Sequence, residues 1–190
     1  MSSTPTEGRG LKPVRRIVTG LDAEGRSTVA SDEICPFTTH FPGIPDYGAT
    51  DIWRTQVPGD NSDPAEPCYT PFPVEPAAGG LVFRISQFPP DHLFVDDFDR
   101  EKAWGSMPGT GHVAQGETFG NGTMHVTTTV DCAVIISGEI YAQLETGEVK
   151  LSAGDTLVQR GTVHGWSNRS SENCIIAFVL IDSGLAARQG

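Results

Sequence analysis

The stretch 124-MHVTTTVDCAVIISGE-139 decides the fold class of this sequence. It sets one histidine, three threonines and one aspartate in front of an apolar run that stops at Ser-Gly-Glu. Alternate side chains of a β-strand share a face, so His125, Thr127 and Thr129 are predicted to point to one side. The stretch therefore predicts a strand with one polar face, which is either a site or the polar surface of an ordinary strand.

Short β-rich segments continue from this stretch towards the C-terminus. They are predicted at 132–138, 139–145, 148–154, 155–161, 163–168 and 174–182. Tight turns are expected at Thr146-Gly147 and at Gly154-Asp155, because glycine beside a small polar residue suits a hairpin connection. Closely spaced strands of this kind are typical of a barrel or sandwich.

The first half of the chain adds further strands and little helix. Strands are predicted at 15–20, 26–32, 50–56 and 79–88, the first two forming a hairpin. Residues 57–80 are dense in Pro, Gly and acids, which indicates an irregular loop that serves as a lid or an inter-subunit arm. A short helix is predicted within 96–104, where aspartates precede good helix formers.

Composition limits the classes of partner. The chain has 190 residues, with 13 Lys+Arg against 24 Asp+Glu and a net charge of −11. Such a field repels phosphate backbones and anionic headgroups, so neither a nucleic acid nor a membrane is expected as a partner. The N-terminal residues lack an apolar signal stretch and the four cysteines are scattered, so we expect a cytoplasmic protein with free thiols.

Two spaced motifs resemble those of the cupin superfamily. The first cupin motif is Gly, five residues, His-x-His, three or four residues, Glu, six residues, Gly; this chain has His125, Thr127, Asp131 and Gly138 at matching spacing. Thr127 replaces the second histidine, Asp131 replaces the glutamate, and Phe119 stands at the place of the opening glycine. The second motif is matched by Gly154, Arg160, Gly161, His164 and Asn168, with arginine in place of proline and one residue fewer before Gly161.

The resemblance implies an all-β, single-domain cupin: an antiparallel β-barrel, or jelly roll, with an N-terminal β extension and little helix. Residues 1–120 are then the extension, packing on the barrel, and residues 121–185 the cupin core, within one structural domain. The resemblance also implies a divalent metal (Fe, Mn, Ni or Zn) in the barrel mouth. The metal ligands, which are also the catalytic residues, would be His125, Asp131 and His164.

The other candidate site residues have two interpretations each. Thr127 shares the face of His125, and Trp166 that of His164, so both are predicted to line a substrate pocket; Trp166 is alternatively core. Arg54 and Arg84 stand among apolar strand residues, where an unpaired guanidinium is costly. Either arginine could hold a substrate carboxylate, or both could lie on a half-exposed strand surface.

Two functions from different classes remain open on this sequence. The first is a metal-assisted enzyme, a lyase, decarboxylase, isomerase or dioxygenase, acting on an organic acid or carbonyl compound. The alternative is a metal-free cupin that binds or senses a small molecule without catalysis. A homodimer is expected in either case, because the early strands and the Pro-rich loop need a surface to cover.

Overall fold

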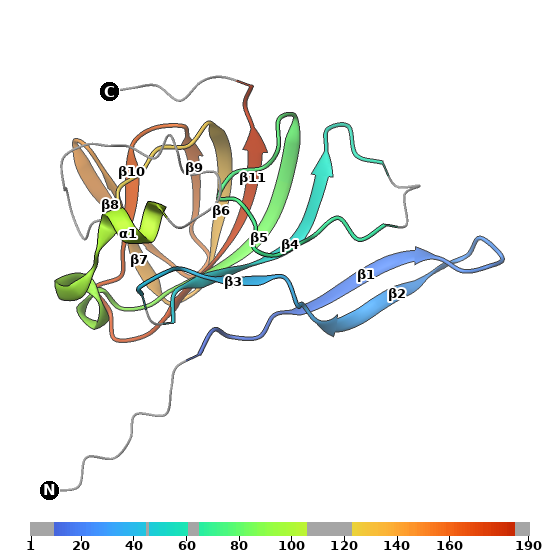
Figure 1. Ribbon diagram of the computed structural model, residues 1–190, viewed down its shortest axis with the longest axis horizontal. Helices are drawn as coiled ribbons and strands as arrows, with labels where there is room; N and C mark the ends of the chain where they lie inside the picture. Colours follow the sequence, from blue (N-terminus) through green and yellow to red (C-terminus); the bar gives the residue numbers. More distant parts are fainter. Residues whose placement is uncertain (1–9, 45, 61–64, 106–122, 185–190) are drawn as a thin grey trace, which may run out of the picture.

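A computed structural model describes residues 10–44, 46–60, 65–105 and 123–184 of the chain. These residues form eleven strands and very little helix, which confirms the predicted all-β class (Figure 1). The strands are β1 Arg15–Leu21, β2 Ser27–Ile34, β3 Thr38–His40, β4 Gly48–Gln56, β5 Gly80–Phe88, β6 Thr129–Ser137, β7 Glu139–Leu144, β8 Gly147–Ser152, β9 Thr156–Arg160, β10 His164–Ser167 and β11 Cys174–Asp182. The α-helix α1, Arg100–Gly105, overlaps the predicted helix, and two 3-10 turns precede it at Asp91–Leu93 and Val95–Asp97.

The strands form three antiparallel sheets. The larger sheet has the order β3-β4-β5-β11-β6-β9, the smaller one β10-β7-β8, and β1 and β2 pair only with each other. β4 and β5 come from the first half of the chain, yet β5 pairs with β11 near the centre of the larger sheet. The first half therefore contributes strands to the main sheet as well as the projecting β1–β2 hairpin (Figure 1).

The core lies between the larger and the smaller sheet. Ile135 of β6, Ile140 of β7, Trp166 of β10 and Ile176 of β11 are buried in one apolar cluster. Burial in β6 alternates as the sequence predicts: Ile135 is 1% exposed and Val134 is 43% exposed. This alternation gives the larger sheet one face towards the core and one face away from it.

One predicted strand boundary is wrong. The segments 124–130 and 132–138 were expected to be two strands, but regular pairing begins only at Thr129 and continues to Ser137 as β6. Before that point the backbone N–H of Thr128 donates to Glu75 of the 57–80 loop instead of to a neighbouring strand. The Glu75 side chain thus takes the place of a neighbouring strand as hydrogen-bond partner, and among the described residues the only β-bridge of 124–128 joins His125 to His164.

In the described ranges no helix is long and apolar enough to cross a membrane. The four cysteines are free, as expected, and Cys132 is the exposed one among them.

Candidate functional site

His125 and His164 lie side by side where the segment before β6 meets β10. Their backbones exchange two hydrogen bonds, with N···O distances of 2.8 and 2.9 Å, and their ring centroids are 4.3 Å apart. Gly165 permits this approach, because a Cβ there would stand 2.7 Å from the sulfur of Met124. The predicted convergence of the two motif histidines is therefore present in the structure.

Both imidazoles are oriented by backbone carbonyls. Nδ1 of His125 lies 2.8 Å from the Thr123 oxygen, and Nδ1 of His164 lies 2.9 Å from the Thr162 oxygen. A carbonyl can only accept, so each Nδ1 carries a proton, and in a neutral ring Nε2 then carries the lone pair. Burial lowers the pKa of His164 to about 4, so this ring is neutral at physiological pH.

The two histidines border a cavity of about 100 Å³ with mainly aromatic walls. The aromatic side chains that line it are Phe41, Tyr47, Phe72, Phe88, Trp104, Trp166 and Phe178. Trp104, from α1, packs over His125 with 4.9 Å between ring centroids. Thr127 and Asp131 add polar groups, and Thr127 accepts a hydrogen bond of 2.9 Å from Thr129. Thr127 and Trp166 thus lie on the cavity wall, as their positions in the predicted strands indicated.

Asp131 brings a buried carboxyl group to the same cavity. It is 4% exposed, and its Oδ1 has no hydrogen-bond partner among the residues that the structure describes. Burial raises the pKa of Asp131 from 3.8 to about 6, against the lowering effects of the nearby Thr129 hydroxyl and of the charge of Arg84. A carboxyl with this pKa exchanges its proton close to neutral pH, as a general acid or base needs to do.

Asp131→Asn is expected to change how stability depends on pH. The raised pKa means that the folded protein binds this proton more tightly than the unfolded chain does. Asp131 therefore stabilises the wild type most below about pH 4, and that contribution is lost as the pH rises through 6. Relative to the wild type, the variant should gain about 2 kcal/mol between pH 4 and pH 7.

Urea unfolding of both proteins at pH 4, 5, 6 and 7 measures this difference. His164 is present in both proteins, so its effect on stability cancels in the comparison. Its lowered pKa acts in the opposite direction: the stability that it contributes is present above pH 6.5 and is lost as the pH falls towards 4. A difference between variant and wild type that stays constant over this range would show that Asp131 titrates like an exposed carboxyl.

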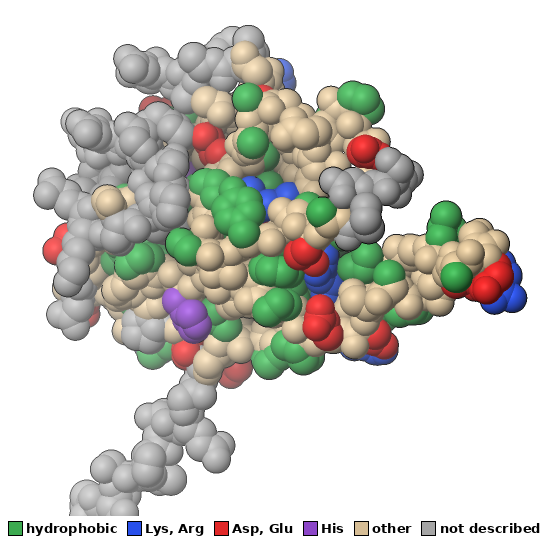
Figure 2. All heavy atoms as spheres, turned by 45° about the vertical axis from the view of Figure 1, so that its right-hand side comes forward, with side chains coloured by type: hydrophobic (Ala, Val, Ile, Leu, Met, Phe, Trp, Pro, Cys, Tyr) green, Lys and Arg blue, Asp and Glu red, His purple; other side chains and the backbone are tan. Residues whose placement is uncertain are grey.

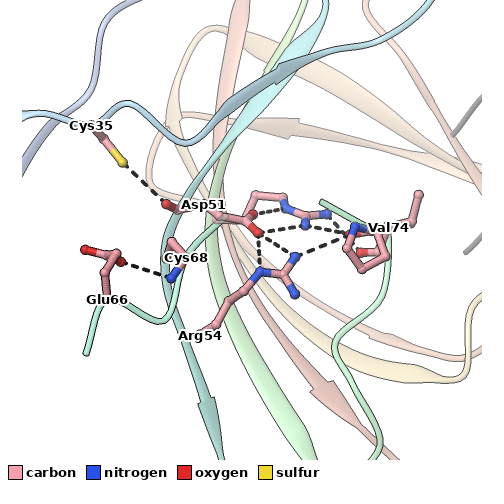
Figure 3. A network of polar contacts seen from close by, with 8 residues as sticks. Cys35, Asp51, Arg54, Glu66, Cys68 and Val74 are labelled. Atoms are coloured by element: carbon pink, nitrogen blue, oxygen red, sulfur yellow. Dashed lines mark hydrogen bonds and ion pairs between the residues drawn. The ribbon is translucent and has the colours of Figure 1, made fainter. Parts of the chain in front are cut away.

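Arg54 and Arg84 are bound to an aspartate of the chain itself. Asp51 is fully buried; Arg84 Nε lies 2.6 Å from its Oδ1, and Arg54 Nε lies 2.7 Å from its Oδ2 (Figure 3). Arg84 lines the cavity and Arg54 does not. Both arginines are buried, so the interpretation of a half-exposed surface is wrong for them. The carboxylate that these two guanidinium groups hold in the structure is that of Asp51.

The 57–80 loop forms part of the cavity wall through residues that the sequence analysis did not single out. Phe72 and Val74 line the cavity, and the ring centroid of Phe72 lies 4.3 Å from the guanidinium carbon of Arg84. Arg84 also donates to the carbonyls of Pro73 and Val74, at 3.0 and 2.9 Å. Glu75 then binds Thr128, next to Thr127 of the cavity. The apolar residues within this Pro-rich loop were the available signal that part of it is buried.

The described residues do not complete a metal site. No group of three or more His, Cys, Asp or Glu side chains within them could hold a metal ion. His125 and His164 supply two adjacent imidazoles, Asp131 lines the same cavity without joining them in such a group, and Thr127 stands where cupins have another histidine. The predicted ligand set of His125, Asp131 and His164 is thus two neighbouring donors and one separate carboxyl.

Comparison with known proteins supports the cupin resemblance. The chain is 27% identical over 184 residues to the cupin-domain-containing oxidoreductase fogC of Aspergillus ruber, a match that covers 91% of this chain and 74% of that protein. It is 48% identical over 52 residues to phomopsin biosynthesis cluster protein C′ of Diaporthe leptostromiformis, which covers 27% of this chain and 28% of that protein. The chain thus spans less than a third of the phomopsin relative's length. No protein-family model matches the chain.

Among solved structures, a cupin 2 conserved barrel domain protein of Salinispora arenicola is similar at 11% identity and a TM-score of 0.39, over 76% of this chain and 81% of that one. The antiparallel sheets, the two motifs and the fogC match agree with a cupin-type fold. These findings support the resemblance that the two sequence motifs predicted.

Proposed function

We propose that the protein is an enzyme that acts on a small organic acid or carbonyl compound bound in the cavity. The observation that supports this most is the pair of adjacent imidazoles, each oriented by a backbone carbonyl, in the wall of a cavity that aromatic side chains also line. A polar group of the substrate would face these rings, and its apolar part would contact the aromatic walls. The Aspergillus ruber relative is named as an oxidoreductase, which also favours an enzyme.

The proposed roles follow from the protonation states of the site. Asp131, with a pKa near 6, is the group best suited to give or take a proton at neutral pH. His164 is a poor base because its pKa is about 4, but its neutral Nε2 can accept a hydrogen bond from the substrate or bind an electrophile. His125 presents the second Nε2 beside it. Thr127 and Trp166 would shape the substrate side of the cavity.

A divalent metal (Fe, Mn, Ni or Zn) remains part of the cupin expectation, and His125 and His164 would be two of its ligands. The described residues do not complete a third donor position, so the roles above use only side chains of the chain. The same observation favours the second candidate function, a cupin that binds a small molecule without turning it over. Homodimer formation and a cytoplasmic location also remain proposals.

Binding and turnover can be measured separately. Trp104 and Trp166 line the cavity, so a bound ligand should change the tryptophan fluorescence of the protein. We would titrate a panel of aromatic and aliphatic carboxylic acids and carbonyl compounds, and then incubate each binder in air with Fe, Mn, Ni or Zn added in turn. Mass spectrometry of the small molecules should detect a new product. Binding without a mass change under every metal condition would favour the sensor function, and no binding at all would contradict both candidates.

A further inference from the structure

The larger sheet has an apolar outer face in addition to the face that covers the core. The register places Phe83 of β5, Val179 of β11, Cys132 of β6 and Val158 of β9 in one row across four neighbouring strands. Val134 and Ile136 continue this face along β6. We call these six residues the outer patch. Soluble proteins rarely leave such a contiguous apolar surface uncovered.

The outer patch is accessible within the chain. Val134, Ile136 and Val158 are 43%, 51% and 60% exposed. Its strand neighbours on the same face are also uncharged, apart from Arg160 opposite Val130. The patch is thus an apolar area with one basic side chain at its margin.

The hairpin formed by β1 and β2 has a matching apolar face. Its register sets Arg15 opposite Ile34, Ile17 opposite Asp32, Thr19 opposite Val29 and Leu21 opposite Ser27. Directly paired residues share a face, so Ile17, Leu21, Val29 and Ile34 all lie on one side. They are 52%, 73%, 56% and 59% exposed, and Figure 2 shows hydrophobic side chains along the hairpin that projects at the right.

We infer that this hairpin packs, apolar face down, on the outer patch of a second copy of the chain, and that the second copy returns the same contact. This inference goes beyond the proposed activity and does not depend on it. Each copy carries both surfaces, so two identical contacts close a two-fold dimer. In the single chain the hairpin extends away from the sheets, which leaves its apolar face without a partner among the described elements (Figure 1).

Charge favours a second copy at these surfaces. The chain carries a net charge of −11, so two copies repel each other over most of their surfaces. The outer patch has no acidic residue among its six members, and the charges on the apolar face of the hairpin, Arg15 and Asp32, neutralise each other through a 2.6 Å ion pair. These two faces are therefore regions where copies can approach without a charge penalty.

The dimensions of the two surfaces also agree. Four strands span about 14 Å at a spacing of about 4.8 Å, and the seven residues of β1 extend for about 23 Å. A two-stranded hairpin is about 5 Å wide between strand axes, so it fits on the patch with room for its side chains. An isolated two-stranded hairpin is only marginally stable in water, so a covering surface would stabilise it as well.

Light scattering of the full chain at micromolar concentration is expected to give twice the 20.3 kDa chain mass. Val158→Lys and Leu21→Lys each place a charge at a position that is exposed in the single chain, so both variants should fold. Each should weaken the dimer at least tenfold, because a lysine would be buried in the contact. Val149→Lys, at a 44% exposed position of β8 in the smaller sheet, is the matched control and should remain dimeric.

Cys132 reports on the contact directly, since it lies in the patch and is the exposed thiol among the four cysteines. Its alkylation should be slow in the wild type and at least tenfold faster in Val158→Lys. In Val29→Cys, oxidation should join the introduced thiol to Cys132 of the other copy. A monomeric wild type overturns the inference. A dimer that Val158→Lys disrupts and Leu21→Lys does not, or a crosslink between the two Cys132 thiols, overturns the exchange of hairpins and indicates sheets packed directly face to face.

Discussion

Asp51→Asn is expected to lower the free energy of unfolding by about 3–5 kcal/mol, because the change leaves two buried guanidinium groups without their carboxylate. Arg54 and Arg84 are both less than one-tenth exposed and both bind Asp51, which is fully buried. For a domain of this size such a loss corresponds to a fall in melting temperature of about 10 °C or more. Thermal unfolding followed by circular dichroism measures it.

Glu148→Gln is the matched control for this change. Glu148 forms a bidentate pair with Arg169 that resembles the Asp51 contacts in geometry, but both partners are exposed. Exposed pairs contribute little to stability, so the control should unfold close to the wild-type temperature. Equal melting temperatures for Asp51→Asn and the wild type would show that the buried cluster does not hold β4, β5 and the 57–80 loop together.

The Asp51 cluster also marks where sequence reasoning reached its limit. The sequence indicated that Arg54 and Arg84 would need an anion if they were buried, but regular alternation places residues 51 and 54 on opposite faces of a strand. A register shift between Asp51 and Trp53 turns Arg54 to the same face as Asp51. A bulge of this kind depends on pairing with β5, so the partner of the two arginines could not be found from the local pattern.

The strands and the histidine pair were predictable for different reasons. Val, Ile and Thr at alternating positions indicate strands locally, and this information sufficed for the hairpin, for β4 and β5 and for the C-terminal strands. The proximity of His125 and His164 came from motif spacing, since no local pattern relates residues this far apart. The cavity walls supplied by Phe72 and Trp104 depend on how a loop and a short helix pack on the sheets, and they became apparent only in the structure.

The largest functional effect is expected from His125→Asn and His164→Asn. Asparagine can keep a donor near the position of Nδ1, and so keep the hydrogen bond to Thr123 or Thr162, but it has no atom at the position of Nε2. If Nε2 contacts the substrate or an electrophile, each variant should lose activity by about 10²- to 10⁴-fold while melting close to the wild-type temperature. Turnover of whichever compound the ligand screen identifies, measured beside thermal unfolding, provides both readouts.

His125→Ala and His164→Ala then separate catalysis from structure. Alanine removes the donor as well, leaving the Thr123 or Thr162 carbonyl unpaired at a cost of about 1–3 kcal/mol. If the rings only satisfy these carbonyls, alanine should lower the melting temperature, asparagine should restore it, and ligand binding should persist in both. If the imidazoles act on the substrate, asparagine restores stability but not turnover. The two variants of each histidine both lack Nε2 and differ only in the donor at Nδ1. Retained turnover in the asparagine variants would therefore exclude both rings from the chemistry. The cupin resemblance would then concern the fold and not the activity of this site.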